Sequence, residues 1–280
     1  MAFVKFSFTS RPGERELLLA FLSQLPFDSF QEAEHPDQLD AYIAENLDDA
    51  NLDQSLQSLK EQWQFRYQKE RMPDQNWNAL WESNFESIQV GNFCGIRADF
   101  HPSMDGVQYQ IVINPKMAFG TGHHETTHMM VQRMAQLSVQ GLRVLDYGCG
   151  TGLLAILAAQ MGASEVEAVD IEQAAYDNSL ENARCNGTPD IKIFKGDLSA
   201  VPPGPPYDLI LANINRNVIL NSLPSLYDRL QVGGRLITSG FVEQDRDLMD
   251  ASFQQAGFRQ TQQLSRNNWL CVSLMKENPN

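Results

Sequence analysis

His124, Glu125 and His128 stand in the spacing His-Glu-x-x-His, which in zinc proteases supplies two metal ligands and a general base. On a helix the two imidazoles would lie one turn apart on the same face. Such a site needs a third ligand further along the chain, and between His128 and Glu165 the only carboxylate or histidine is Asp146. Because Asp146 falls at the end of an expected strand beneath a glycine turn, we expect no metal site. Glu125 instead suits the first turn of a helix.

A stronger chemical signal is VLDYGCGTG, residues 144–152, in which Gly148, Gly150 and Gly152 lie between an apolar strand and a helical pattern. Glycine at these positions lets a ligand approach the backbone closely and leaves the helix N-terminus open toward it. The spacing G-x-G-x-G differs from the G-x-G-x-x-G of dinucleotide folds, and the Lys-Ser/Thr of a Walker loop is missing, so no pyrophosphate cradle is predicted. We therefore expect Gly148 and Gly150 to contact a ligand. The alternative is a tight strand-to-helix turn without one.

Polar residues end the strands that follow. Asp170 ends the second strand, where a carboxylate can accept hydrogen bonds from both ribose hydroxyls of a nucleoside. Asp197 ends the third, positioned to bind an adenine amino group, and Asn213 ends the fourth. Since ligands bind at the carboxyl ends of parallel strands, these side chains should line one site, although each acid alone could be a helix cap or a solvated turn.

The elements that must position these residues alternate from residue 143 onward. Short apolar runs typical of buried strands are separated by helical patterns, which predicts a parallel, doubly wound sheet. The strand-like runs are 143–148, 166–171, 191–197 and 207–214, and the helical patterns are 153–163, 172–187 and 215–234. Residues 258–276 contain two strand-like halves without a helix between them, so they should add an antiparallel pair at the edge.

The first 70 residues have a separate pattern, with elements in the order β-α-β-β-α-β that is typical of the ferredoxin-like fold. The expected elements are strand 3–8, helix 12–25, strands 27–33 and 38–45, helix 51–63 and strand 65–70. A helix over 74–86 with an aromatic stripe should link this unit to the rest, and strands should follow within 87–98 and 109–115. We thus expect an α+β domain at 1–70, a linker at 71–87 and an α/β domain at 88–280.

The composition of the chain limits the classes of binding partner and the cellular compartment that we expect. The 35 Asp and Glu against 21 Lys and Arg give a net charge of −14, a field that repels nucleic-acid phosphates and favours a cationic partner, unless it serves solubility alone. No apolar run reaches the roughly 18 residues of a membrane span, and the start of the chain lacks the pattern of a signal peptide. The four cysteines show no CxxC spacing, so we expect no structural zinc and a reduced, cytoplasmic setting.

Several segments resemble the class I S-adenosylmethionine-dependent methyltransferases. LDYGCGTG is similar to their glycine motif, AVDI to the strand end that binds ribose, KGD to the adenine motif and LILANI to the motif after the fourth strand. NPKMAFGTGHHETT, together with LENARCNG and GGRLITSGFVEQD, is similar to segments of the ribosomal protein L11 methyltransferases, the PrmA family. The resemblance covers residues 74–275 well. It implies a Rossmann-like domain with a mostly parallel seven-stranded sheet, preceded by the ferredoxin-like domain.

The resemblance also implies a cofactor, a substrate and site residues. The cofactor would be S-adenosylmethionine, and the acceptors would be lysine ε-amines and the N-terminal α-amine of ribosomal protein L11, a basic partner held by the first domain. Cofactor contacts would fall on Thr127, Gly148, Asp170 and Asn213, with Phe119, Gly120 and Thr121 closing over the methionine end. Asn213 is the candidate for steering the acceptor amine, together with the Ile214 carbonyl.

One motif departs from the pattern of that family. The family usually reads Asn-Ile-Leu-Ala after the fourth strand, whereas this chain has Asn213, Ile214, Asn215 and Arg216. Two polar residues thus replace small apolar ones near the expected acceptor. Two alternatives therefore stay open: a methyltransferase that acts on another protein lysine or a small amine, and a non-enzymatic nucleoside-binding module of ribosome assembly.

Overall fold

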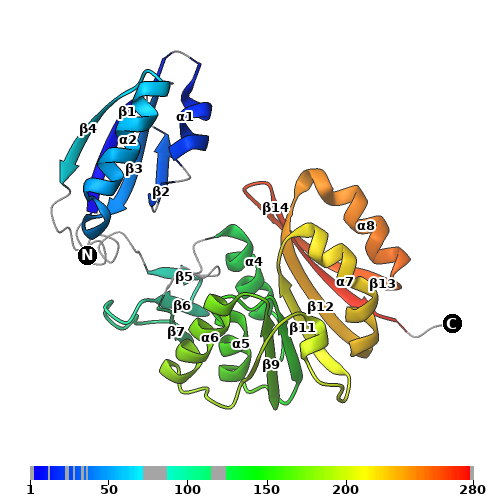
Figure 1. Cartoon of the computed structure of the whole chain (residues 1–280). Helices are drawn as coiled ribbons and strands as arrows, with labels where there is room; N and C mark the ends of the chain where they lie inside the picture. Colours follow the sequence, from blue (N-terminus) through cyan, green and yellow to red (C-terminus); the bar gives the residue numbers. More distant parts are fainter. Residues whose placement is uncertain are drawn as a thin grey trace. The chain divides into compact units, whose positions relative to one another are not determined.

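The structure of the chain is a computed structural model that describes residues 3–11, 13–22, 25–27, 29–32, 35, 37–71, 87–114 and 124–277 (Figure 1). The chain divides into two compact units, Met1–Asn84 and Phe85–Asn280. The helix expected over 74–86 and the residues Phe119, Gly120 and Thr121 lie outside the described residues.

The first unit is an α+β domain whose elements follow the predicted order. They are β1 (Phe3–Thr9), α1 (Arg15–Leu22), β2 (Ser29–Glu32), β3 (Gln38–Ala44), α2 (Ala50–Gln62) and β4 (Arg66–Arg71). The four strands pair in antiparallel fashion in the order β2-β3-β1-β4, which confirms the ferredoxin-like arrangement. Side chains alternate along β1, since Phe6 and Phe8 are buried in the core whereas Lys5 pairs with Asp40.

The second unit contains a seven-stranded and a three-stranded sheet. The large sheet consists of β8 (Arg143–Tyr147), β9 (Glu165–Asp170), β10 (Lys192–Lys195), β11 (Tyr207–Asn213), β12 (Leu230–Val242), β13 (Phe258–Arg266) and β14 (Trp269–Lys276). Its order is β10-β9-β8-β11-β12-β14-β13, with parallel pairing from β10 to β12 and antiparallel pairing of β14 with both neighbours. This confirms the doubly wound sheet and the antiparallel pair at its edge. The small sheet is formed by β5 (Ile88–Val90), β6 (Cys94–Arg97) and β7 (Tyr109–Val112).

Helices cover both faces of the large sheet (Figure 1). One face packs against α4 (Glu125–Met134), α5 (Leu153–Gln160) and α6 (Gln173–Cys185), and the other against α7 (Arg216–Arg229) and α8 (Arg246–Gln255). Neighbouring residues of β8 therefore belong to different cores, with Val144 in the first and Leu145 in the second. Burial on both faces explains why the central strands of this sheet appear in the sequence as short apolar runs. Within the described part of the chain, no helix is long and apolar enough to cross a bilayer.

The helix predicted over 215–234 is shorter than its pattern. α7 ends at Arg229, and Leu230 is already extended, with φ −91° and ψ 137°, and pairs with Tyr207 of β11. Gly233 has a φ of +77°, a conformation that glycine tolerates and that does not continue a right-handed helix. The helix prediction was therefore wrong for residues 230–234, which begin β12 instead.

Candidate functional site

A cavity of about 470 Å³ lies at the carboxyl edge of the large sheet. Its lining comes from the ends of β8 to β11, from a bulge in β12, from the start of β14 and from the N-terminus of α4. Small-molecule sites in proteins span about 300–1,000 Å³, so the volume is that of a ligand site. The residues predicted from the sequence that line it are Thr127, Gly148, Gly150, Asp170, Asp197, Asn213 and Ile214.

The glycine loop between β8 and α5 forms the centre of the cavity wall. Gly148, Gly150 and Gly152 have φ values of +71°, +53° and +81°, a region that favours glycine. The glycine at every second position of this loop is therefore explained by the backbone conformation at these residues. The N–H groups of Gly148 and Cys149 donate to the Val169 carbonyl at 2.9 and 3.1 Å. Gly152 is the N-cap of α5. The loop is thus tied to the end of β9 and leads directly into a helix N-terminus.

Asp146 lies beneath this loop and is almost completely buried. Its Oδ2 accepts a hydrogen bond from the Ala155 N–H at 3.0 Å, whereas its Oδ1 has no hydrogen-bond partner among the described residues. Burial, reinforced by the nearby charge of Asp170, raises the pKa of the Asp146 carboxyl to about 7, against the lowering effect of the Ala155 bond. The carboxyl connects the end of β8 to the first turn of α5.

Asp170, at the end of β9, both lines the cavity and organises the loop. Its Oδ2 accepts from the Gly150 N–H at 2.8 Å, and its Oδ1 accepts from the Glu172 N–H at 3.0 Å. Each carboxylate oxygen has a further lone pair, and the residue is only half-buried. The carboxylate is therefore oriented by the backbone and still able to accept from two ligand hydroxyls.

Asp197 follows β10 and has a structural role of its own. Its Oδ1 accepts from the N–H and the Oγ of Ser199 at 2.8 and 2.6 Å, and it caps the short 3-10 helix η2 (Leu198–Ala200). These two hydrogen bonds lower the pKa of the Asp197 carboxyl. The preceding Gly196 N–H donates to the Asp170 carbonyl at 2.8 Å, which joins the ends of β10 and β9. Asp197 is therefore a helix cap, which was the alternative to ligand binding for this acid. Binding of adenine by its carboxylate stays a prediction.

The end of β11 meets the start of α4 at the cavity. The Asn213 amide nitrogen donates to the Thr127 Oγ1 at 3.2 Å, although 86 residues separate the two in the sequence. Thr127 is buried in the first turn of α4. Two residues that the family resemblance placed at the cofactor are therefore bonded to each other. The bond leaves the amide oxygen of Asn213 as an acceptor for a ligand.

The two polar residues that depart from the family pattern have structural partners. Asn215 is the N-cap of α7, where its Oδ1 accepts from the Val218 N–H at 3.1 Å. Arg216 forms an ion pair with Asp245, which follows β12. The ion pair accounts for Arg216, whereas Asn215 both caps α7 and lines the cavity.

Ile214 lies between Gly148 and Gly240, a contact that was not predicted from the sequence. A Cβ added to Gly148 would stand 2.0 Å from the Ile214 Cγ2, and one added to Gly240 would stand 1.9 Å from the Ile214 carbonyl oxygen. Gly240 has a φ of +105° and lies where the register between β12 and β14 shifts, which marks a bulge. A lone glycine within a strand pattern is the sequence signal for such a close approach. The two glycines make room for Ile214 at the cavity wall.

An asparagine of α6 and the asparagine that caps its C-terminus connect the glycine loop to β7 and the residues after it. Asn182 and the C-cap residue Asn186 are four residues apart and so lie on the same side of the helix. Asn186 exchanges hydrogen bonds with the N–H and the carbonyl of Val112 at 2.8 and 2.7 Å. The buried Asn182 accepts from the Asn114 N–H at 3.0 Å and donates to the Thr151 carbonyl at 2.9 Å. Asparagine is unfavourable inside helices, so its recurrence every four residues is the signal that could have indicated this contact.

The His-Glu-x-x-His stretch forms the N-terminus of α4. His124 is the N-cap, and its Nδ1 accepts from the Thr126 N–H at 3.3 Å and lies 2.8 Å from the Thr126 Oγ1. Glu125 lies in the first turn, as predicted, and forms an ion pair with Arg266. Among the residues that the structure describes, no three His, Cys, Asp or Glu side chains are grouped as metal ligands.

The strand order of the large sheet, with a glycine loop after β8 and an acid at the end of β9, is that of the class I methyltransferases. The chain belongs to the family described as ribosomal protein L11 methyltransferase (PrmA), whose model matches residues 23–277. The match extends through both units and confirms the resemblance seen in the sequence motifs. The chain is therefore an S-adenosylmethionine-dependent methyltransferase.

Similar proteins carry the same description. A Porphyromonas gingivalis protein named ribosomal protein L11 methyltransferase is 40% identical over 286 residues, which covers 98% of this chain and 97% of the relative. A protein of the same name from Bacteroides fragilis is 35% identical over 281 residues, which covers 98% of this chain and 100% of the relative. The crystal structure of a ribosomal protein L11 methylase from Lactobacillus delbrueckii subsp. bulgaricus is 28% identical and matches with a TM-score of 0.63, covering 69% of this chain and 100% of that one.

Proposed function

We propose that this enzyme transfers methyl groups from S-adenosylmethionine to amines of ribosomal protein L11, namely lysine ε-amines and the N-terminal α-amine. The observation that carries this proposal is the likeness, over nearly the full length of both chains, to proteins named for that activity. A different amine acceptor or a non-enzymatic assembly module has no comparable support.

The residues around the cavity fit S-adenosylmethionine. Asp170 has one acceptor oxygen for each ribose hydroxyl, and Asp197 lies at the next strand end, on the side where adenine would lie. The glycine loop lets the methionine part approach the backbone, and the bonded pair Thr127 and Asn213 lies beyond it. When bound, S-adenosylmethionine supplies a methyl group activated by a sulfonium sulfur.

The contribution of the chain to the transfer is orientation. An ammonium must first lose a proton to water, because only the lone pair of the neutral amine can attack. With the donor bound, the neutral amine would then take the methyl group, its new C–N bond replacing the C–S bond of the donor. The Asn213 amide oxygen and the Ile214 carbonyl can accept hydrogen bonds from the amine and so direct its lone pair.

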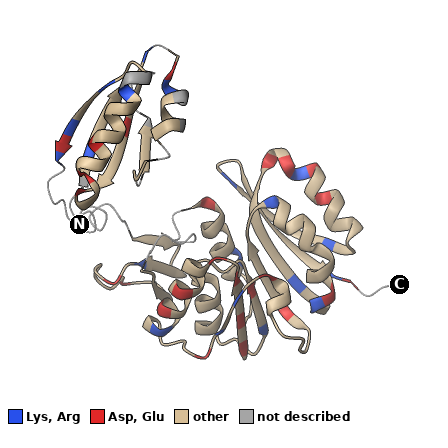
Figure 2. Cartoon of the chain, viewed as in Figure 1, with Lys and Arg blue, Asp and Glu red and all other residues tan. Residues whose placement is uncertain are grey.

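The charge of the chain suits a basic protein substrate. Asp and Glu outnumber Lys and Arg in both units, and Figure 2 shows acidic residues on α6 and α8 of the second. Such a field attracts a cationic partner and repels nucleic acid. We infer that the first unit holds the ribosomal protein while the second carries out the transfer. All four cysteines are free, which fits the reducing cytoplasm in which ribosomal proteins are made.

A transfer assay tests the proposal. The purified protein is incubated with labelled S-adenosylmethionine and with ribosomal proteins that lack this methylation, and we expect one labelled band, identified by mass spectrometry as L11. Calorimetry measures cofactor binding in parallel. Binding without transfer would contradict the proposal in favour of a binding module, and label on a different protein or a small amine would contradict it in favour of another acceptor.

Replacing Asn213 with alanine should lower kcat by about 10- to 100-fold, since a positioned hydrogen-bond partner of the reacting group is lost. The Kd for S-adenosylmethionine should rise by a smaller factor, measured by calorimetry. Asn217→Ala is the matched control, because Asn217 is exposed on α7 and lies outside the cavity lining. Wild-type kinetics together with wild-type cofactor affinity in Asn213→Ala would show that the assigned role is wrong.

A further inference from the structure

The β14 end of the cavity is walled by a ring pair that was not predicted from the sequence. Trp269, the first residue of β14, and His124, the N-cap of α4, both line the cavity. Their rings meet edge to face, with centroids 4.6 Å apart and planes at 72°. An aromatic side chain therefore forms part of the wall on the side opposite the acids of β9 and β10.

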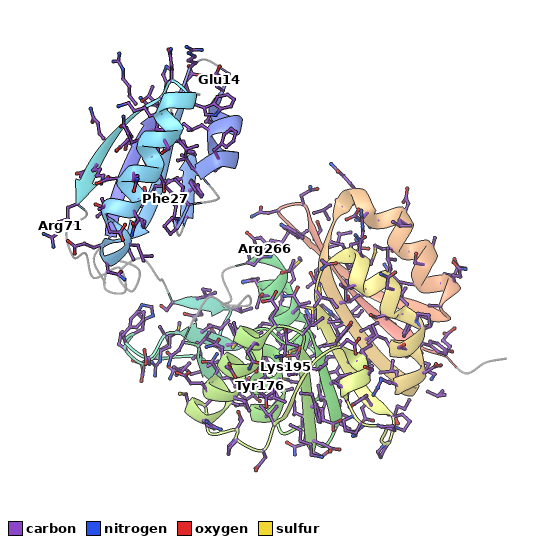
Figure 3. All side chains as sticks on the ribbon, viewed as in Figure 1. Glu14, Phe27, Arg71, Tyr176, Lys195 and Arg266 are labelled. Carbon is purple, nitrogen blue, oxygen red and sulfur yellow. The ribbon has the colours of Figure 1, made fainter. Side chains whose placement is uncertain are left out.

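Contacts around the turn between β13 and β14 hold Trp269 in place. Arg266 forms an ion pair with Glu125 of α4, and Asn267 donates to the same carboxylate at 2.6 Å. Figure 3 shows Arg266 beside the start of α4. Asn267 and Asn268 have φ values of +44° and +69°, as in a two-residue hairpin turn, so β14 begins immediately at Trp269. The position of the indole is thus fixed by α4 as well as by the hairpin.

The strand order shows which part of a substrate this wall would meet. Along the carboxyl edge the cavity passes the ends of β10, β9, β8, β11, β12 and β14 in turn. Asp197 and Asp170 mark the nucleoside side at β10 and β9, and Asn213 ends β11 beyond the glycine loop. Trp269 stands four strand spacings from Asp170, or roughly 19 Å at about 4.8 Å per spacing. A donor held by Asp170 and the glycine loop would therefore leave the Trp269 side of the cavity to the acceptor.

We propose that Trp269 binds the acceptor, with its indole packed against the alkyl chain and the ammonium group of the amine to be methylated. The inference rests on the proposed transfer to amines. An indole suits both parts of a lysine side chain, because its apolar surface covers the methylene groups and its π-face attracts a cation. Each methylated amine that is protonated is again a cation, so the same face holds the acceptor between successive transfers.

Three variants at Trp269 separate the effect of the aromatic ring on activity from the effect of apolar bulk. Trp269→Ala should lower kcat/KM for unmethylated ribosomal protein L11 about tenfold, while the Kd for S-adenosylmethionine changes less than about twofold. Trp269→Phe should recover most of the loss, and Trp269→Leu, which keeps apolar bulk without a ring, should recover less. Mass spectrometry of the product should show lower methylation states accumulating with Ala and Leu.

A matched control exists in the same unit. Phe100 forms a similar edge-to-face pair with His101, at 4.6 Å and 71°, outside the cavity lining. Phe100→Ala should therefore leave kcat/KM and the distribution of products unchanged. If Trp269→Ala does not fold, as judged by thermal melting, the comparison of the Phe and Leu variants decides the matter.

The outcomes separate this inference from the proposed function. No transfer by the wild-type protein would overturn both. Wild-type transfer with an unaffected Trp269→Ala variant would overturn the inference alone. Equal recovery by Phe and Leu would also overturn it, since the ring would then not be the binding group. A rise in the Kd for the cofactor that matches the fall in kcat/KM would place Trp269 at the donor and equally overturn it.

Discussion

Replacing Asp170 with alanine should lower the affinity for S-adenosylmethionine by about a hundredfold or more. The carboxylate is proposed to accept from both ribose hydroxyls, and each charge-assisted hydrogen bond contributes about 1.5–3 kcal/mol. The same carboxylate accepts from the N–H groups of Gly150 and Glu172, so its loss also removes two supports of the cavity wall. Calorimetric titration of the cofactor measures the change in Kd, and thermal melting measures the loss of support.

Asparagine at position 170 should be nearly as damaging as alanine. An amide has only one oxygen, so its nitrogen would face the N–H of either Gly150 or Glu172. Asp177→Ala is the matched control, because Asp177 is exposed on α6 and lies outside the cavity lining, and it should leave the Kd unchanged. Wild-type affinity in Asp170→Ala would contradict the ribose role, and an unchanged melting temperature would contradict the role in holding the loop.

The large sheet could be predicted because its strands carry a clear signal. β8, β9 and β11 are largely buried on both faces, so each appears in the sequence as a short apolar run bounded by turn residues, whereas β10 at the edge of the sheet is partly exposed. The extent of β12 could not be predicted in the same way. Residues 230–234 have no strong periodicity of their own, and they join the sheet across a shift in register with β11. Their state depends on the neighbouring strand rather than on local preference.

Part of the candidate site follows from the same logic. Asp170, Asp197 and Asn213 end parallel strands, and the carboxyl ends of such strands meet at one edge, where the structure has its cavity. Trp269 and Gly240 reach that edge by other routes, one at the start of an antiparallel strand and the other at a bulge. No local pattern indicates the route of Trp269, and the only local signal for Gly240 is a lone glycine within a strand pattern. The contact between Thr127 and Asn213 also joins distant segments; the family resemblance implied that both residues lie at the cofactor, but their contact was not predicted.

Replacing Gly240 with alanine should lower both the stability and the turnover of the enzyme. The added Cβ would stand 1.9 Å from the Ile214 carbonyl oxygen and 2.6 Å from its carbonyl carbon, on a residue with φ +105°. Overpacking costs about 1–3 kcal/mol and left-handed backbone strain about 1–2 kcal/mol, so the free energy of unfolding should fall by roughly 2–5 kcal/mol. The melting temperature should fall by several degrees.

Gly233→Ala measures the cost of backbone strain without steric overlap. Gly233 has a φ of +77°, and an added Cβ there would meet nothing within 4 Å. Urea denaturation of both variants gives the cost of the Ile214 contact as their difference in unfolding free energy. Since Ile214 follows Asn213 in the chain, relief of the overlap must displace the residue that is proposed to steer the amine. The kcat of Gly240→Ala should therefore fall by about tenfold or more at a temperature at which the variant is folded. Equal stabilities of the two variants, or wild-type turnover in folded Gly240→Ala, would show that the close approach of Gly240 to Ile214 does not shape the site.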